Sequence, residues 1–368
     1  MPKRYFIDAV FHQQKGQNKN LLNQKLLVVA IIIFLLIVFT ISYCLFGFNS
    51  KDDGDVINSK TSEQQNKTKT PLIFSALNGV FLNKQDKELL PVAVLIDNII
   101  DAWPPSGINQ ASIIYEVPVE AGITRLIAIF SQTNLPQKIG PVRSARPYLA
   151  HLVGEYGALF VHAGGSFQVL QELKQGDHQV YNVDALTSDG RYFWRGVDKK
   201  APHNLFISKD NLQQIITKRQ LPTEANFSSW LWQDEPSIEK RPIISSEIII
   251  NFSNSSYQVK WRYQRETNHY LRWQKNLAYL DDQRKQIETS NIIIQYVPVS
   301  IIDSVGRRKI DLTGQGKTIV FRDGRTIIGQ WKKENNRTRF FDENDKEIAF
   351  NSGQIWIEIV PEETDVIY

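Results

Sequence analysis

The chain has 368 residues, enough for a terminal segment and about two domains. Hydrophobic residues make up 42% of it and aromatic residues 11%, which excludes a fully disordered chain. The net charge is +4, but residues 1–70 hold nine basic and five acidic residues, which leaves 34 of each in the remainder. A neutral remainder argues against nucleic acid as the main partner, because binding phosphates requires a basic surface. With one cysteine, Cys44, the chain cannot form an internal disulfide or a cysteine-based zinc site.

Residues 26–48 are an uncharged apolar run of 23 residues, long enough to span a bilayer as a helix. We predict a transmembrane signal-anchor there, after a cytoplasmic tail at 1–25. Lipidation of Cys44 is an alternative, although Tyr43 stands where such sites usually have a small residue. Three basic residues lie near each end of the run, so charge does not decide the orientation. We place the C-terminal part outside the cytoplasm because this is the commoner arrangement for a single N-terminal span.

Residues 49–70 are polar and nearly free of apolar side chains, which predicts a flexible stalk. The first folded domain is expected at 71–220. Its first strand is predicted over 91–97, and the next two, 112–120 and 123–130, form a hairpin around a turn at 121–122. This hairpin would bring Glu116 and Glu120 close to Arg125.

A helix is predicted over 143–156, because its apolar residues repeat along one face. A strand at 158–162 follows, and the Gly164-Gly165-Ser166 turn leads into a helix at 167–174. Such a turn offers backbone N–H groups to an anion, although it lacks the P-loop lysine and the G-x-G-x-x-G pattern. Ser208 is expected to cap a further helix that ends near Arg219. Strands that alternate with helices predict a mixed α/β domain.

Residues 221–242 contain three prolines and are predicted to link this domain to a second one at 243–368. Helical patterns are absent from the sequence there. Strands are predicted at 247–252, 257–263, 270–273, 291–299 and 354–360, with a hairpin over Asp323-Gly324 in 317–331. We therefore expect an α+β protein: a mixed α/β domain, then an antiparallel β domain, behind one transmembrane helix.

Six short motifs occur in order along the chain: V-L-I-D-N at 94–98, Y-E-V-P-V-E at 115–120, G-I-T-R at 122–125, I-G-P-V-R-S-A-R at 139–146, V-H-A-G-G-S at 161–166 and K-A-P-H-N at 200–204. On these motifs, residues 75–365 resemble the YerB-like family of bacterial lipoproteins of unassigned function. The resemblance implies an α/β N-terminal part, a β-rich C-terminal part and an exported, membrane-tethered protein, and it implies no activity. The chain departs from the family in its anchor, and in Ala121, where the family more often has glycine.

The motif residues suggest a site for an anionic ligand. Arg143 and Arg146 are three apart, so they can share one side of a helix start, and the planar guanidinium fork suits phosphate or carboxylate. The alternative is that these arginines form structural ion pairs with Glu116, Glu120 and Asp97. The candidate ligand-binding set is Asp97, Asn98, Glu116, Glu120, Arg125, Arg143, Ser144, Arg146, His162, Gly164, Gly165, Ser166, Arg195, His203 and Asn204.

The best catalytic candidates are His162, as a proton donor or acceptor, and Glu116, while a satisfied structural histidine is the alternative for His162. A triad with Ser166 is not supported, because G-G-S lacks the G-x-S-x-G form of a nucleophile elbow. A metal site from His162, His203 and Asp97 has no supporting spacing such as H-E-x-x-H. We therefore expect no metal and no cofactor, and we do not favour an enzyme.

Three functions remain open. The favoured one is a membrane-anchored extracytoplasmic protein that binds an anionic envelope component, such as a phosphorylated glycan or a lipid-linked precursor. The second is a structural or regulatory partner of another envelope protein. The third is an envelope hydrolase or phosphotransferase, suggested only by analogy with membrane-tethered transferases that have arginine-rich sites.

Overall fold

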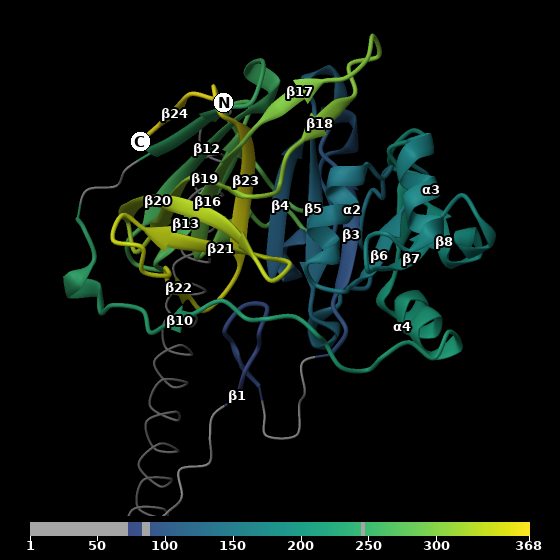
Figure 1. Cartoon of the computed structure of the whole chain (residues 1–368), viewed down its shortest axis with the longest axis horizontal. Helices are drawn as coiled ribbons and strands as arrows, with labels where there is room; N and C mark the ends of the chain where they lie inside the picture. Colours follow the sequence, from purple (N-terminus) through teal and green to yellow (C-terminus); the bar gives the residue numbers. More distant parts are fainter. Residues whose placement is uncertain (1–72, 83–88, 244–246) are drawn as a thin grey trace, which may run out of the picture. The chain divides into compact units, whose positions relative to one another are not determined.

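Ten strands from both halves of the chain form one continuous sheet in the computed structural model (Figure 1). The structure describes residues 73–82, 89–243 and 247–368, which belong to one compact unit that covers 70–368. The expected cytoplasmic tail, the apolar span at 26–48, Cys44 and the stalk lie outside the described residues. Within the described residues, no helix has the length and apolar character needed to cross a membrane.

The described part of the N-terminal half, up to the expected linker, contains three α-helices and nine strands. The helices are α2 (Pro147–Gly154), α3 (Phe167–Gln175) and α4 (Lys209–Lys218). The strands are β1 (Ile73–Phe74), β2 (Phe81–Leu82), β3 (Val92–Asp97), β4 (Ile113–Pro118), β5 (Thr124–Phe130), β6 (Leu159–His162), β7 (Tyr181–Asp184), β8 (Phe193–Arg195) and β9 (Leu205–Ile207).

The described part of the C-terminal half is built of strands joined by turns and short 3-10 segments. They are β10 (Trp232–Gln233), β11 (Glu247–Asn251), β12 (Gln258–Gln264), β13 (His269–Gln274), β14 (Leu277–Ala278), β15 (Glu288–Thr289), β16 (Asn291–Val297), β17 (Val299–Ile301), β18 (Arg308–Ile310), β19 (Gln315–Arg322), β20 (Arg325–Glu334), β21 (Arg337–Asp342), β22 (Phe350–Asn351), β23 (Ile355–Pro361) and β24 (Val366–Ile367).

The long sheet has the order β21-β20-β19-β16-β23-β4-β5-β3-β6-β7. Strand β23, near the C-terminus, runs parallel to both β16 and β4, so it joins the two halves of the chain. In Figure 1 the yellow β23 lies beside the blue strands β4, β5 and β3. The segments expected as separate domains, 71–220 and 243–368, therefore build one sheet, and the C-terminal segment is not purely antiparallel.

Several predicted elements are present. The hairpin β4–β5 pairs Pro118 with Thr124, and β19–β20 turns over Asp323 and Gly324. Both turn residues have positive φ angles, 55° and 67°, which is the backbone of the expected type I′ turn. The hydroxyl of Ser208 accepts a hydrogen bond from Asn211 N at 3.2 Å and caps α4 as predicted.

The expected helix at 143–156 is wrong at its start. Helix α2 begins at Pro147, and Arg146 before it is extended (φ −137°, ψ 155°). A residue that precedes proline is sterically disfavoured in the helical region, while proline itself suits the first helical position. Residues 143–146 are therefore extended, and the apolar periodicity of the following residues does not reach back to them.

Two packed layers cover the long sheet, one on each face. Along β3, alternate side chains enter different clusters: Val94 and Ile96 pack on one face, and Ala93 and Leu95 on the other. A smaller antiparallel sheet, β14-β13-β12-β11-β24 with β15 beside β13, packs with α4 on the first face. Helices α2 and α3 pack on the second face. The site residues discussed below lie at these two layers.

Candidate functional site

The arginine-rich motif crosses the ends of the strands as an extended segment. Arg143 N donates to Leu95 O of β3 at 2.9 Å, and Ala145 N donates to Gly164 O at 2.8 Å. These bonds tie the motif to β3 and to the Gly-Gly-Ser turn. Because the segment is extended, its arginine side chains do not share one helix face; Arg143 and Arg146 pair with different carboxylates.

Asp97, at the end of β3, contacts two motif side chains. Its Oδ2 lies 2.9 Å from Arg143 Nε and 2.7 Å from His203 Nδ1, and the aspartate is buried. Arg195 is exposed and donates from Nη1 to Asn204 Oδ1 at 2.8 Å. Asp97 is therefore ion-paired with Arg143 and hydrogen-bonded with His203, and Arg195 with Asn204 forms a separate contact.

Glu120 accepts a bidentate pair of bonds from Arg146, at 2.5 Å to Nε and 3.0 Å to Nη2. Burial acts to raise the pKa of Glu120, but the bonds from Arg146 outweigh it and hold that pKa below its usual value. Arg125 Nη1 donates to Ser144 O at 2.6 Å, and burial together with the nearby Arg146 lowers the pKa of Arg125 to about 10. Asp97 and Glu120 therefore form structural ion pairs with Arg143 and Arg146, which is the alternative to an anion site.

The Gly-Gly-Ser turn already uses its polar groups. Gly164 N donates to Asp184 Oδ1 at 2.7 Å, so a carboxylate of the chain stands where an anion was expected. Ser166 Oγ accepts from Val169 N at 3.4 Å and caps α3. Gly164 has a φ of +65°, and a Cβ on Gly165 would meet Val169 Cγ1 at 2.6 Å. The two glycines are thus required by backbone conformation and packing.

His162 is fully buried at the end of β6. Its Nδ1 lies 2.9 Å from Gly164 O, and its Nε2 lies 2.6 Å from Asn182 Oδ1. Both ring nitrogens therefore have partners within the protein, and the geometry is that of the structural histidine. Within the described residues, no group of three or more His, Cys, Asp or Glu side chains could hold a metal ion.

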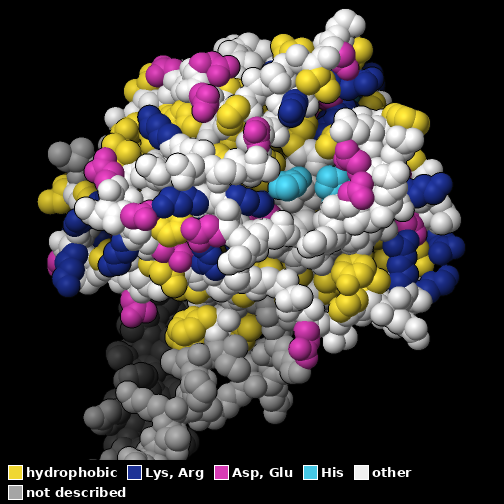
Figure 2. Space-filling model, viewed as in Figure 1, with side chains coloured by type: hydrophobic (Ala, Val, Ile, Leu, Met, Phe, Trp, Pro, Cys, Tyr) yellow, Lys and Arg dark blue, Asp and Glu magenta, His cyan; other side chains and the backbone are white. Residues whose placement is uncertain are grey.

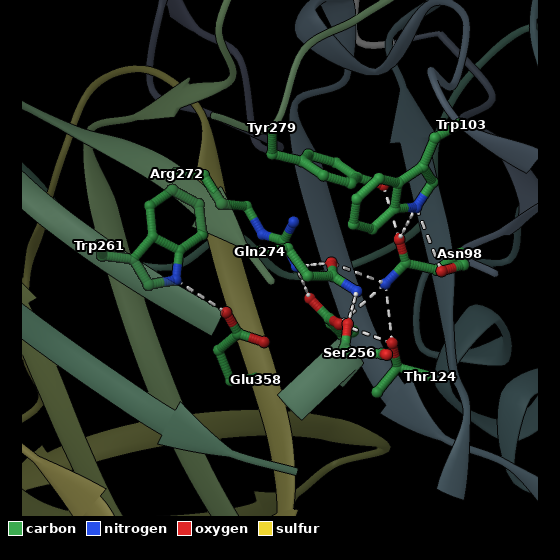
Figure 3. A network of polar contacts seen from close by, with 10 residues as sticks. Asn98, Trp103, Thr124, Ser256, Trp261, Arg272, Gln274, Tyr279 and Glu358 are labelled. Carbon is green, nitrogen blue, oxygen red and sulfur yellow. Dashed lines mark hydrogen bonds and ion pairs between the residues drawn. The ribbon is translucent and has the colours of Figure 1, made fainter. Parts of the chain in front are cut away.

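A buried polar network lies between the long sheet and the smaller sheet (Figure 3). Asn98, after β3, donates from Nδ2 to Glu116 Oε1 at 3.0 Å and to Thr124 Oγ1 at 2.7 Å. Its Oδ1 accepts from the Tyr279 hydroxyl at 2.6 Å. Arg272 Nη2, from β13, donates to Glu116 Oε2 at 2.5 Å. The predicted site residues Asn98 and Glu116 are brought together here, closed off from solvent.

Glu358 is a second buried carboxyl beside this network. It lies on β23 in register with Glu116 on β4, and both side chains are fully buried. Its Oε1 accepts from Trp261 Nε1 at 2.9 Å, while Oε2 makes no hydrogen bond among the described residues. Burial raises the pKa of Glu358 well above its usual value, and the neighbouring Glu116 carboxylate raises it further.

The cavities of the structure lie away from most of the predicted residues. The first, termed the α2/α3 cavity, has a volume of about 580 Å³ and lies between α2, α3 and the segment 302–313 around β18. It is lined by the motif's own continuation, Pro147 and Tyr148, and by His151 and His178. Figure 2 shows histidine side chains gathered over α2 and α3, with acidic side chains beside them. The second, termed the Arg337 cavity, has a volume of about 640 Å³ and lies at the other end of α2.

Sequence reasoning missed Arg272, Arg337, Glu358, Tyr148 and His151. Arg272, Arg337 and Glu358 lie on strands whose alternation of apolar and polar residues is visible in the sequence. Charged residues in such a strand are expected to face solvent, whereas these three are buried. Tyr148 lies within the helix predicted over 143–156, where its spacing favours the apolar face, and it is buried, with a hydroxyl that makes no hydrogen bond among the described residues.

Comparison with known proteins finds two matching families. Residues 77–222 match the family described as protein of unknown function (DUF3048), N-terminal domain, and residues 248–357 match the corresponding C-terminal domain. The chain is 32% identical over 287 residues to the Bacillus subtilis (strain 168) protein named "Putative lipoprotein YerB", an alignment that covers 78% of this chain and 86% of that one. The crystal structure of the YerB protein from Bacillus subtilis superposes with a TM-score of 0.71 at 30% identity and covers 80% of this chain and all of that one.

Proposed function

Because the chain belongs to the DUF3048 family, for which no function is assigned, we propose from its geometry that it is a membrane-anchored extracytoplasmic protein that binds an anionic envelope component. The ligand class is a phosphorylated glycan or a lipid-linked precursor. The observation that carries the proposal is the α2/α3 cavity, which is lined by two residues with buried polar atoms that have no partner among the described residues, and three guanidinium groups act electrostatically on the first of these residues, Tyr148.

The two polar atoms are the Tyr148 hydroxyl and His151 Nε2, both on α2 and both without a hydrogen bond among the described residues. They lie three residues apart, so they share one face of the helix, and both residues line the cavity. Buried polar atoms in native proteins nearly always have a partner. A ligand oxygen in the cavity would supply the missing partner to each.

The charges around the Tyr148 hydroxyl favour an anion. Three guanidinium groups, Arg125, Arg146 and Arg308, and one carboxylate, Glu120, act on it electrostatically. Arg308 and the exposed Lys309 also line the cavity, together with the carboxylates of Glu172 and Asp311. Glu172 is bonded to His178 at 2.8 Å. Positive charge is thus concentrated at the Tyr148 end, where the anion would bind.

Membrane attachment is supported by the apolar run at 26–48 and by the lipoprotein name of the Bacillus subtilis relative. We place the anchor in a single-pass helix, with residues 71–368 outside the cytoplasm, and the alternative is a lipid on Cys44. A reporter that is active only outside the cytoplasm, fused after Tyr368, should be active. Mass spectrometry of the full chain should show an unmodified Cys44. A lipid adduct on Cys44 would instead indicate that the protein is attached by a lipid anchor.

Tyr148→Phe tests the binding site because it removes one oxygen and leaves the ring. The variant should be at least as stable as wild type, since the hydroxyl has no partner to lose and its burial is unfavourable. Its affinity for vesicles that contain polyprenyl phosphate, and for phosphorylated wall glycan, should fall by roughly ten-fold, the effect of losing one hydrogen bond to a charged group.

Two variants that each remove one positive charge complete the test. Lys309→Gln removes a cation from the cavity, whereas Arg307→Gln removes one from the same hairpin outside it. Only the first should weaken binding. If Tyr148→Phe unfolds more easily and binds as wild type does, or if both charge variants weaken binding equally, the cavity is not the site.

The enzyme alternative receives less support. Its best candidates, His162 and Glu116, are both fully buried, and Ser166 serves as a helix cap. A side chain that must contact substrate needs access to a cleft.

A further inference from the structure

The Arg337 cavity is lined by a buried cation whose guanidinium nitrogens make no hydrogen bond of normal geometry within the described residues. Arg337 is the first residue of β21 and is 1% exposed. Its guanidinium carbon lies 4.1 Å from the ring centre of Tyr156 and 4.1 Å from that of Trp230, with Phe227 at 5.7 Å. Aromatic rings thus fix the plane of the guanidinium without using its hydrogen-bond donors.

None of the three guanidinium nitrogens makes a hydrogen bond of normal geometry within the described part of the chain, although the Tyr156 hydroxyl lies close enough to interact with the guanidinium. The carboxylate of Glu155 is 3.6 Å from Nη1, beyond hydrogen-bond distance. That carboxylate is instead bonded to Lys333 Nζ at 2.5 Å and to Thr338 N at 2.9 Å. Buried arginines almost always bond through several of their five donors, so this fork lacks its expected acceptor.

The net charge of the side chains around Arg337 also favours the binding of a single anion. Arg337, Lys333 and Glu155 are two cations and one carboxylate, and their side chains are 2%, 12% and 0% exposed. A buried group with one excess positive charge is stabilised by one negative charge from outside. Glu224 also lines the cavity, but it is solvent-exposed.

The other lining residues indicate what the anion is attached to. The cavity has a volume of about 640 Å³, within the usual range for small ligands. The lining includes five amide and hydroxyl side chains, namely Gln179, Asn226, Ser228, Asn335 and Asn336, alongside apolar residues such as Leu90 and Val180. Amide side chains both donate and accept hydrogen bonds, as peptide groups do.

We propose that the Arg337 cavity binds the free carboxylate of a peptide C-terminus, with the guanidinium fork on the carboxylate and the amide side chains on the adjacent peptide groups. A carboxylate carries the one negative charge that the cluster lacks and matches the fork in a planar, bidentate manner. This goes beyond the proposed envelope ligand, because the cavity, the cation and the anion are all different.

The probe is a pool of N-acetyl dipeptides with free C-terminal carboxylates, compared with the same pool capped as C-terminal amides. Isothermal titration calorimetry with the full-length protein in nanodiscs should detect the carboxylate pool and show roughly ten-fold or greater weakening for the amide pool. Equal binding of the two pools, or no binding of either to folded protein, overturns the proposal.

Variants at the exposed lining locate the binding without disturbing the core. Ser228→Asp places a negative charge at the cavity and should weaken binding, while Glu224→Gln removes one and should strengthen it. Thr223→Asp is the matched control, because it is exposed and does not line the cavity. Equal weakening by Ser228→Asp and Thr223→Asp would contradict the assignment. Tyr148→Phe should leave peptide binding unchanged, so failure of this proposal and of the envelope-ligand proposal can be distinguished.

Discussion

Replacing Glu358 with glutamine should make the protein more stable at neutral pH. The carboxyl is fully buried, its Oε1 accepts from Trp261, and its Oε2 makes no hydrogen bond among the described residues. Burial and the adjacent Glu116 raise its pKa well above the usual value, against the opposing effect of Arg272. Glutamine has nearly the shape of the protonated acid and keeps an oxygen for Trp261.

The expected size follows from proton linkage. With a raised pKa, the folded state keeps a proton on Glu358 at pH values where the unfolded chain has released it, that is, above about pH 4.3. The stability from this group is fully present below that pH and is lost as the pH rises towards the folded pKa, by about 1.4 kcal/mol per pH unit. Because Glu358→Gln cannot titrate, its advantage over wild type should grow with pH at about that slope.

Urea unfolding of the full-length protein in detergent micelles, followed by tryptophan fluorescence from pH 4.5 to 8, measures this slope. Glu363→Gln is the control, since it removes an exposed carboxylate from the segment that follows β23. A difference between Glu358→Gln and wild type that does not change with pH, or a variant that is less stable at pH 7, would refute the reasoning.

Three further changes probe the buried charges and the motif. Arg272→Met should cost about 3–5 kcal/mol in the same unfolding assay, because it leaves the Glu116 carboxylate buried without its cation; a loss below about 1 kcal/mol would contradict this. Ser166→Ala should cost about 1 kcal/mol as a lost helix cap, whereas an unchanged stability would return this serine to the candidate ligand site. Burial and the nearby Lys138 lower the pKa of Lys199 to about 8, so in competitive acetylation it should become half-reactive near pH 8, well below the value of about 10.4 for a free lysine; a midpoint at that higher pH would exclude the shift.

Local patterns predicted the local elements well. The strands β3, β4 and β5 follow from short runs of apolar and β-branched residues, and the β19–β20 hairpin follows from Asp323-Gly324. The predicted helix start at Arg143 was wrong because the prediction followed the helical periodicity alone. Pro147, which is also visible in the sequence, disfavours a helical conformation at the residue before it. These features depend on a few neighbouring residues, and such residues are sufficient to predict them.

Long-range pairing and the identity of the buried face could not be predicted. On β13, Arg272 and Gln274 are fully buried while Trp273 is half-buried, so the strand has the expected period with the polar residues inside. This reversal depends on Glu116, 156 residues away, which supplies the counter-charge. Likewise, the partner that fixes Arg146 is Glu120, 26 residues away on the β4–β5 connection. A single sequence does not show which distant charges meet.

The place of β23 in the sheet constrains how the protein can be made. Strand β4 needs β23 as its neighbour, and β23 begins at Ile355, more than 230 residues after β4 ends at Pro118. During synthesis the hydrogen-bonding edge of β4 must therefore wait unpaired until almost the whole chain has been produced. A chain cut short before Ile355 would therefore keep an unpaired strand edge along β4, where other chains could pair.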